Sequence, residues 1–63
     1  MISVSEYFQK RREELGLTIP QISHSLNIRP EYLEAIEKEN DKIFVSDVYR
    51  KGFVKLYAKY LGL

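Results

Sequence analysis

The sequence predicts an all-helical fold, a small helical bundle in which two short helices form a helix-turn-helix between two flanking helices. Apolar residues recur at helical spacing, and capping boxes at residues 3–6 and 18–21 mark where the first two helices begin. Glycine, asparagine and proline interrupt this pattern between the helices. We expect residues 1–63 to form a single domain. A domain of this size buries only about 60 % of its unfolded surface, so its helices must share one core.

Composition and charge exclude several classes of protein. The absence of cysteine rules out a disulfide framework and a thiolate metal site. We expect neither a membrane span nor a signal peptide, because no apolar run approaches the ~20 residues that a span requires. The net charge is only +1, but residues 29–47 are acidic, whereas residues 48–63 carry Arg50 and three lysines with no acid. This asymmetry bears on the choice of partner more than the total charge does.

The first helix is predicted over residues 4–14. A capping box begins it, and Ile2 and Tyr7 have the spacing of a hydrophobic staple. Phe8 is expected to face inward. Gly16 ends the helix, because glycine adopts a positive φ without strain.

The second helix is predicted over residues 19–26, where the other capping box begins it. Leu17 and Ile22 have the spacing of its hydrophobic staple. Pro20 falls in the first turn, where its missing N–H group is tolerated. Asn27 suits the turn that follows.

The third helix is predicted over residues 30–38, with Pro30 at the first helical position and Glu34 and Lys38 as an i,i+4 ion pair. Residues 43–45 form an apolar connector, either extended or irregular and plugging the core. The predicted core comprises Phe8, Leu17, Ile22, Leu26, Ile28, Leu33 and Ile36, with Val4 or Leu15 beside Phe8.

The closing helix, predicted within residues 46–63, has an unusually wide apolar face. Ser46 is its predicted N-cap, Asp47 complements the helix dipole, and Gly62 ends it. An apolar arc of about 160° contains Leu56, Tyr49, Tyr60, Phe53, Tyr57, Leu61 and Val54. A separate row contains Lys51, Lys55 and Lys59. The arc exceeds the ~100° stripe of an ordinary surface helix, so either the core takes all of it or part is left for a partner.

The most common use of a helix-turn-helix is to bind DNA, with its second helix in the major groove. Here that helix would present four carboxylates, those of Glu31, Glu34, Glu37 and Glu39. A duplex carries a negative charge about every 1.7 Å of its axis and would repel them. No Arg, Asn or Gln lies mid-helix to contact base edges. A DNA-binding regulator remains the alternative, with Arg29, Lys38 and the fourth-helix lysines on phosphates.

Catalysis has less support than binding. His24 is the only histidine, and its neighbours Ser23 and Ser25 point in other directions on the same helix. A nucleophilic pair needs contact in space and an orienting acid. The sequence has no phosphate-binding glycine loop and no metal-ligand cluster. We therefore expect no enzyme activity, no cofactor, no metal and no small-molecule ligand.

Most of the chain resembles the cytoplasmic helix-turn-helix domain of the RodZ family. The segments that carry the resemblance are YLEAIE at 32–37, VYRKGF at 48–53 and YAKYLGL at 57–63. The pattern is also matched by Arg12, GLT at 16–18 and IRP at 28–30. The connector departs from it, since Glu39 stands where the family usually has a glycine, and 44–47 replaces a Leu-Pro-Gly-Pro-like lead into the fourth helix.

The resemblance implies a lambda-repressor-like fold and a bacterial membrane protein of which this chain is the N-terminal cytoplasmic fragment. In the RodZ family this domain docks on the actin-like filament protein MreB and couples it to cell-wall elongation and rod shape. It lies at the cytoplasmic face of the inner membrane, held by a segment absent from this chain. The family's docking surface is largely the fourth helix, and its aromatic pair falls on Phe53 and Tyr57.

We therefore predict an adaptor domain that binds MreB through its fourth helix. Phe53 and Tyr57 are the expected anchors, because aromatic side chains dominate interface energetics. The residues expected around them are Tyr49, Tyr60, Lys51, Lys55 and Lys59. A third possibility is a dimerisation module that uses the same aromatic arc on a second copy of itself.

Overall fold

The computed structural model describes residues 3–63, and over this range the chain is helical. The elements are α1 (Val4–Glu14), α2 (Ile19–Leu26), α3 (Pro30–Lys38), the short 3-10 helix η1 (Asp41–Ile43) and α4 (Asp47–Tyr60). No strand occurs in the described range. The predicted all-helical class and the bounds of the first three helices are confirmed. The predicted staple of Ile2 with Tyr7 lies outside the described residues.

Backbone N–H groups donate hydrogen bonds to polar side chains at the starts of α1, α2 and α4. Thr18 and Gln21 form the full reciprocal capping box, and the Ser46 hydroxyl accepts from the Tyr49 N–H at 3.1 Å. At Ser3 only the hydroxyl half of the predicted box forms, with the Glu6 N–H. Each of these bonds satisfies an amide that the helix itself leaves without a partner.

Left-handed residues end the second and third helices. Asn27 has a φ of 56°, and Asn tolerates this region. Glu39 has a φ of 57°, which is unfavourable for a residue with a long side chain. Glu39 therefore carries local strain at the point where α3 gives way to the connector.

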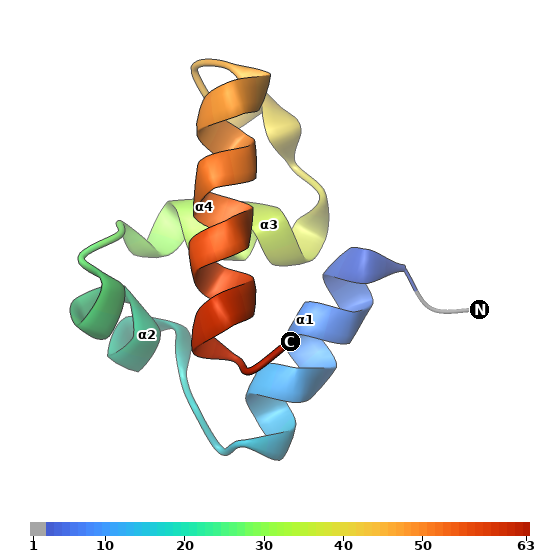
Figure 1. Cartoon of the computed structure of the whole chain (residues 1–63), viewed down its shortest axis with the longest axis vertical. Coiled ribbons are helices and arrows are strands. Elements are labelled where there is room, and N and C mark those ends of the chain that lie inside the picture. Colours follow the sequence, from blue (N-terminus) through green and yellow to red (C-terminus); the bar gives the residue numbers. More distant parts are fainter. Residues whose placement is uncertain (1–2) are drawn as a thin grey trace.

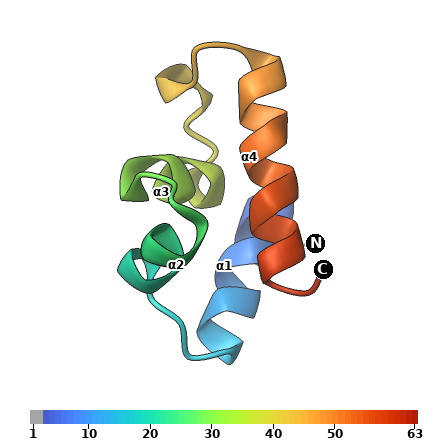
Figure 2. The ribbon, with the colours of Figure 1, turned by 60° about the vertical axis from the view of Figure 1, so that its left-hand side comes forward.

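The four helices do not form equal layers. α3 contacts α1, α2 and α4, so it is the element to which the others attach. α4 crosses over this group, and its N-terminal half extends past α3, where only the connector lies beside it (Figure 1; Figure 2). One end of α4 is thus packed on the bundle, and the other projects from it.

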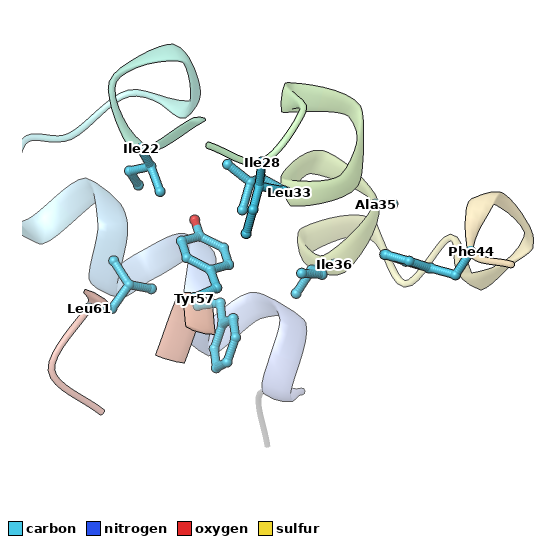
Figure 3. Packing of buried hydrophobic residues seen from close by; sticks show 9 residues of the cluster. Ile22, Ile28, Leu33, Ala35, Ile36, Phe44, Tyr57 and Leu61 are labelled. Carbon is cyan, nitrogen blue, oxygen red and sulfur yellow. The ribbon is translucent and has the colours of Figure 1, made fainter. Parts of the chain in front are cut away.

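The core is formed from α1, α2, α3, α4 and the connector (Figure 3). Its buried apolar residues are Phe8, Ile22, Ile28, Leu33, Ala35, Ile36, Phe44, Tyr57 and Leu61. All of the predicted core residues belong to it, although Leu17 and Leu26 are only partly buried. Val4 and Leu15 are exposed, so the prediction that one of them accompanies Phe8 is wrong. α1 buries Ser5 and Phe8 instead, which share one face of the helix.

The connector is irregular and contributes a side chain to the core, as one of the two alternatives predicted from the sequence has it. After η1 the chain buries Phe44, and the ring lies 5.5 Å from that of Tyr32 on α3. Figure 3 shows Phe44 apart from the other core side chains, on the side of the connector. Val45 points to solvent. Phe44 thereby completes a small aromatic cluster beside the projecting half of α4. We call the rings of Tyr32, Phe44, Tyr49 and Phe53 the aromatic cluster.

Candidate functional site

Helix α4 turns the middle of its apolar arc into the core. Tyr57 is completely buried, and its ring meets Phe8 edge-on, with the centroids 5.3 Å apart. In Figure 3 the Tyr57 ring lies between Leu61 and the side chains of Ile28 and Leu33. The prediction that Tyr57 is an exposed docking anchor is therefore wrong. Its phenol has a partner inside the domain, and the inward position is fixed by that partner.

The partner of Tyr57 is the buried carboxylate of Glu37. The Tyr57 hydroxyl donates a hydrogen bond to it, and Arg12 donates two more through Nε and Nη2, at 2.8 and 3.0 Å. Arg12 Nη1 also donates to the Leu17 carbonyl at 3.0 Å. A buried carboxylate is tolerated only when it is paired and hydrogen-bonded, and Glu37 is both. This network joins α1, α3 and α4, and it fixes how α4 is rotated about its axis.

The same network raises the pKa of two of its members, Arg12 and Tyr57. The hydrogen bond to Glu37 raises the pKa of the Arg12 guanidinium. Burial raises the pKa of the Tyr57 phenol above its ordinary value, and the hydrogen bond to Glu37 raises it further. Both groups therefore keep their protons in the folded domain.

The burial of Glu37 also changes which carboxylates α3 exposes. The sequence analysis predicts that Glu37 is one of four exposed carboxylates on the third helix. This prediction is wrong, because the Glu37 side chain is buried. Glu31, Glu34 and Glu39 remain exposed. The predicted ion pair of Glu34 with Lys38 is absent from the ion pairs of residues 3–63. The exposed surface of α3 is still acidic.

Phe53, the other predicted anchor, is partly buried in the aromatic cluster. Its ring centroid lies 5.2 Å from that of Tyr32 and 4.6 Å from that of Tyr49. The ring of Phe44 completes the cluster, 6.2 Å from Phe53. Phe53 thus supports the projecting half of α4 and is only partly accessible to solvent.

One flank of the predicted arc does remain exposed. Tyr49, Leu56 and Tyr60 are exposed, whereas the opposite flank, Val54 and Leu61, packs inward. The Tyr60 hydroxyl lies 3.3 Å from Ser25 Oγ, so that ring is held against α2. The arc is therefore wider than the core uses.

The exposed flank is bordered by lysines of unequal freedom. Lys51 Nζ lies 3.2 Å from Asp47, and the hydrogen bonds from Lys51 and Arg50 lower the pKa of the Asp47 carboxyl. Lys55 and Lys59 are exposed and take part in no ion pair within residues 3–63. We call the outer face of α4 the surface formed by Val48, Tyr49, Gly52, Leu56, Tyr60, Lys55 and Lys59.

Sequence reasoning missed two residues of this outer face, Val48 and Gly52. Val48 is 81 % exposed, but it lies opposite the apolar arc and so was not assigned to the predicted docking surface. Its position could have been noticed in the sequence, because Val48 is an apolar residue on the same side of the helix as the three lysines. Gly52 entered only as part of the family resemblance. A glycine inside a helix destabilises it by about 0.5–1 kcal/mol relative to alanine, which was the signal to consider.

Two structural features bear on other kinds of site. Among residues 3–63 no three His, Cys, Asp or Glu side chains gather as they would around a metal ion. Within the same range no helix has both the length and the apolar character needed to cross a bilayer.

Comparison with known proteins identifies the family. Residues 7–63 match the model of a family described as a helix-turn-helix domain. The chain is also 35 % identical, over 65 positions, to a curated protein of Haemophilus influenzae described as uncharacterized. That match takes in 100 % of this chain and 21 % of the relative, so the chain spans about a fifth of the relative's length. No solved structure matches the chain. The chain belongs to this family of helix-turn-helix domains.

Proposed function

We propose that this domain is a cytoskeletal adaptor that binds the actin-like filament protein MreB through the outer face of α4. The observation that carries the proposal is the row of exposed Tyr49, Leu56 and Tyr60, which lies beside two exposed lysines that form no ion pair within residues 3–63. Apolar and aromatic side chains of this kind supply most of the energy of a protein interface. The resemblance of α4 to the docking helix of the RodZ family supports the same choice of partner.

The proposal assigns new roles to the two aromatic residues first expected to be anchors. In this proposal Tyr57 holds α4 on the bundle through its hydrogen bond to Glu37, and it does not contact MreB. Phe53 stiffens the projecting half of the helix within the aromatic cluster. The contacts with the filament pass instead to Tyr49, Leu56 and Tyr60, with Lys55 and Lys59 contributing to steering.

The location of the domain is part of the same proposal. The domain acts at the cytoplasmic face of the inner membrane, and the membrane anchor belongs to a part of the protein outside this chain. In this arrangement the domain links MreB filaments to the machinery that elongates the cell wall.

The test is co-sedimentation of purified domain with MreB filaments, because the chain offers closely matched controls. Leu56 is 47 % exposed on α4, and Leu15 is 43 % exposed at the end of α1. Leu56→Ala should weaken binding by about tenfold or more, whereas Leu15→Ala should leave it unchanged. Tyr49→Ala should behave like Leu56→Ala, and Tyr7→Ala on α1 is its control. Equal binding by Leu56→Ala and Leu15→Ala would move the docking site away from α4.

Two further measurements separate this function from the other candidates. Binding of duplex DNA should be sequence-independent, with a dissociation constant of ~10⁻⁴–10⁻⁶ M at physiological salt, because α3 exposes carboxylates. A defined site bound at nanomolar concentration would favour a transcription regulator. Sedimentation equilibrium should give a monomer, and a dimer that Leu56→Ala dissociates would favour the dimerisation module.

A further inference from the structure

Gly52 lies inside α4, and nothing within the domain requires a glycine there. Its φ is not in the left-handed region, unlike those of Gly16 and Gly62, so the backbone would accept any L residue. A Cβ built at Gly52 meets no heavy atom within 4 Å. Neither conformation nor internal packing therefore explains the absence of a side chain.

A glycine in this position also has a cost. A glycine inside a helix loses more backbone entropy on folding than alanine does, so the helix is weaker for it. The projecting half of α4 lies beside the connector, and Phe53 attaches it to Tyr32 of α3 and to Phe44 (Figure 1; Figure 2). A helix with so little support would gain stability from alanine at this position.

The neighbours of Gly52 are the side chains of the outer face. Val48 and Leu56 lie one turn before and after it, and Tyr49 and Lys55 lie at i−3 and i+3. All four side chains are exposed. The missing side chain thus leaves bare helix backbone at the centre of a ring of exposed groups, where another protein could approach closely.

The charge around Gly52 favours one kind of partner. Lys55 and Lys59 have no ion partner in the described chain, and the only acid of α4, Asp47, is held by Arg50 and Lys51. An acidic partner surface would neutralise the two free lysines, whereas a basic one would be repelled.

We propose that Gly52 is the specificity-determining position of the outer face, and that it receives an apolar side chain projecting from an acidic surface of the partner protein. This inference rests on the proposed function, in which the outer face of α4 binds a filament. It adds the chemistry of the partner and the residue that selects it.

The experiment compares Gly52→Ala and Gly52→Leu with Gln9→Leu, which places the same leucine on an exposed part of α1. Each variant is melted by circular dichroism and titrated against purified MreB filaments. Gly52→Leu should melt at or above the temperature of the parent and bind at least tenfold more weakly. Gly52→Ala should bind about two- to fivefold more weakly, and Gln9→Leu should bind like the parent. Higher thermal stability with weaker binding is the result that distinguishes a contact position from a structural one.

Charge is tested separately by reversing the two free lysines. The Lys55→Glu, Lys59→Glu double variant should bind at least tenfold more weakly, and the control Lys10→Glu on α1 should not. Equal binding by Gly52→Leu and the parent would overturn the role of Gly52 and leave the proposed function intact. Equal binding by the double variant would overturn the acidic partner surface. A parent domain that fails to bind filaments at all would overturn the proposed function, and this inference with it.

Discussion

The two halves of α4 belong to one continuous helix but have opposite surroundings. In the C-terminal half, Tyr57 and Leu61 are 0 % and 1 % exposed and pack among α1, α2 and α3. In the N-terminal half, Val48 and Tyr49 are exposed, and Phe53 is only partly buried. The C-terminal half therefore anchors the helix by one face and leaves Leu56 and Tyr60 exposed on another, whereas the N-terminal half makes fewer contacts with the bundle.

The difference teaches that a wide apolar arc is not a uniform surface. Residues of one type take different roles along it, since Tyr57 is a core residue and Tyr49 is an exposed one. What separates them is the Glu37 carboxylate, which fixes the rotation of α4 by its hydrogen bond to the Tyr57 phenol. A small domain can in this way bury one face of a helix in its core and leave another face of the same helix exposed.

The largest expected effect comes from removing the buried ring. Tyr57→Ala should destabilise the domain by about 3–5 kcal/mol, because it leaves a cavity and removes a partner of Glu37. Since the single core of so small a domain rarely supplies more than ~3–5 kcal/mol of stability, this variant should be largely unfolded at 37 °C. Tyr49→Ala should cost about 0.5–1.5 kcal/mol, the value of an aromatic contact. Circular dichroism melts of both variants check the comparison, and equal losses would remove the distinction between the two halves.

The next effect isolates the phenol of Tyr57. Tyr57→Phe keeps the ring and should cost about 1.5–3 kcal/mol at pH 7, since it removes a hydrogen bond to a charged carboxylate. The pKa of Tyr57 is raised by burial, so the folded domain keeps a proton that the unfolded chain loses above its ordinary pKa of about 10. The contribution of the phenol is therefore complete below pH 10 and falls by ~1.4 kcal/mol for each pH unit above it.

Urea titrations of both proteins between pH 7 and 11.5 measure this dependence. The stability gap between the parent and Tyr57→Phe should narrow above pH 10. The other tyrosines and the lysines titrate in both proteins, so their effects cancel in the difference. A gap that stays constant to pH 11.5 would mean that burial beside Glu37 does not raise the pKa of Tyr57.

The helices could be predicted from the sequence, but the buried and exposed residues of α4 could not. The reason is that helix caps join residues close in sequence, whereas the contacts that orient α4 join residues far apart in sequence. Caps such as Thr18 with Gln21 act over three residues, so they are visible in the sequence. The rotation of α4 depends on Arg12, Glu37 and Tyr57, which come from three separate helices. A glutamate in an amphipathic helix is normally solvated, and its burial follows from a partner 25 residues away.

A signal for this network was nevertheless present. Arg12 lies one turn after the buried Phe8, and Glu37 lies one turn after the buried Leu33. Two opposite charges on two core faces predict a buried pair. The resemblance to a docking helix instead placed Tyr57 on the surface, which shows that a family's site residues do not transfer without their surroundings.

A smaller effect on stability is expected at Glu39, which follows α3 and begins the segment that leads to the N-terminal half of α4. Glu39 has a φ of 57°, a region in which glycine is not strained. Glu39→Gly should raise the free energy of unfolding by about 0.5–1 kcal/mol, the relief of strain being partly offset by the greater entropy of the unfolded chain. Because Glu39 is outside the outer face of α4, filament binding should not change. Denaturation and co-sedimentation of the same protein check both halves of this expectation, and a loss of stability would contradict it.

The smallest effect is at the exposed start of α4, where acid should loosen one turn of the helix. Hydrogen bonds from Lys51 and Arg50 lower the pKa of Asp47, so its support is present above the ordinary pKa of about 4 and is lost as pH falls through the lowered value. Asp47 also complements the helix dipole, and both contributions disappear on protonation. The ¹³Cα chemical shifts of residues 48–51 should move toward coil values between pH 6 and 2, while those of residues 57–61 stay helical. Asp47→Asn should show the loosened shifts already at pH 6 and little further change. If residues 57–61 lost helix together with residues 48–51, the two halves of α4 would form one cooperative unit, and the C-terminal half would not anchor the helix independently.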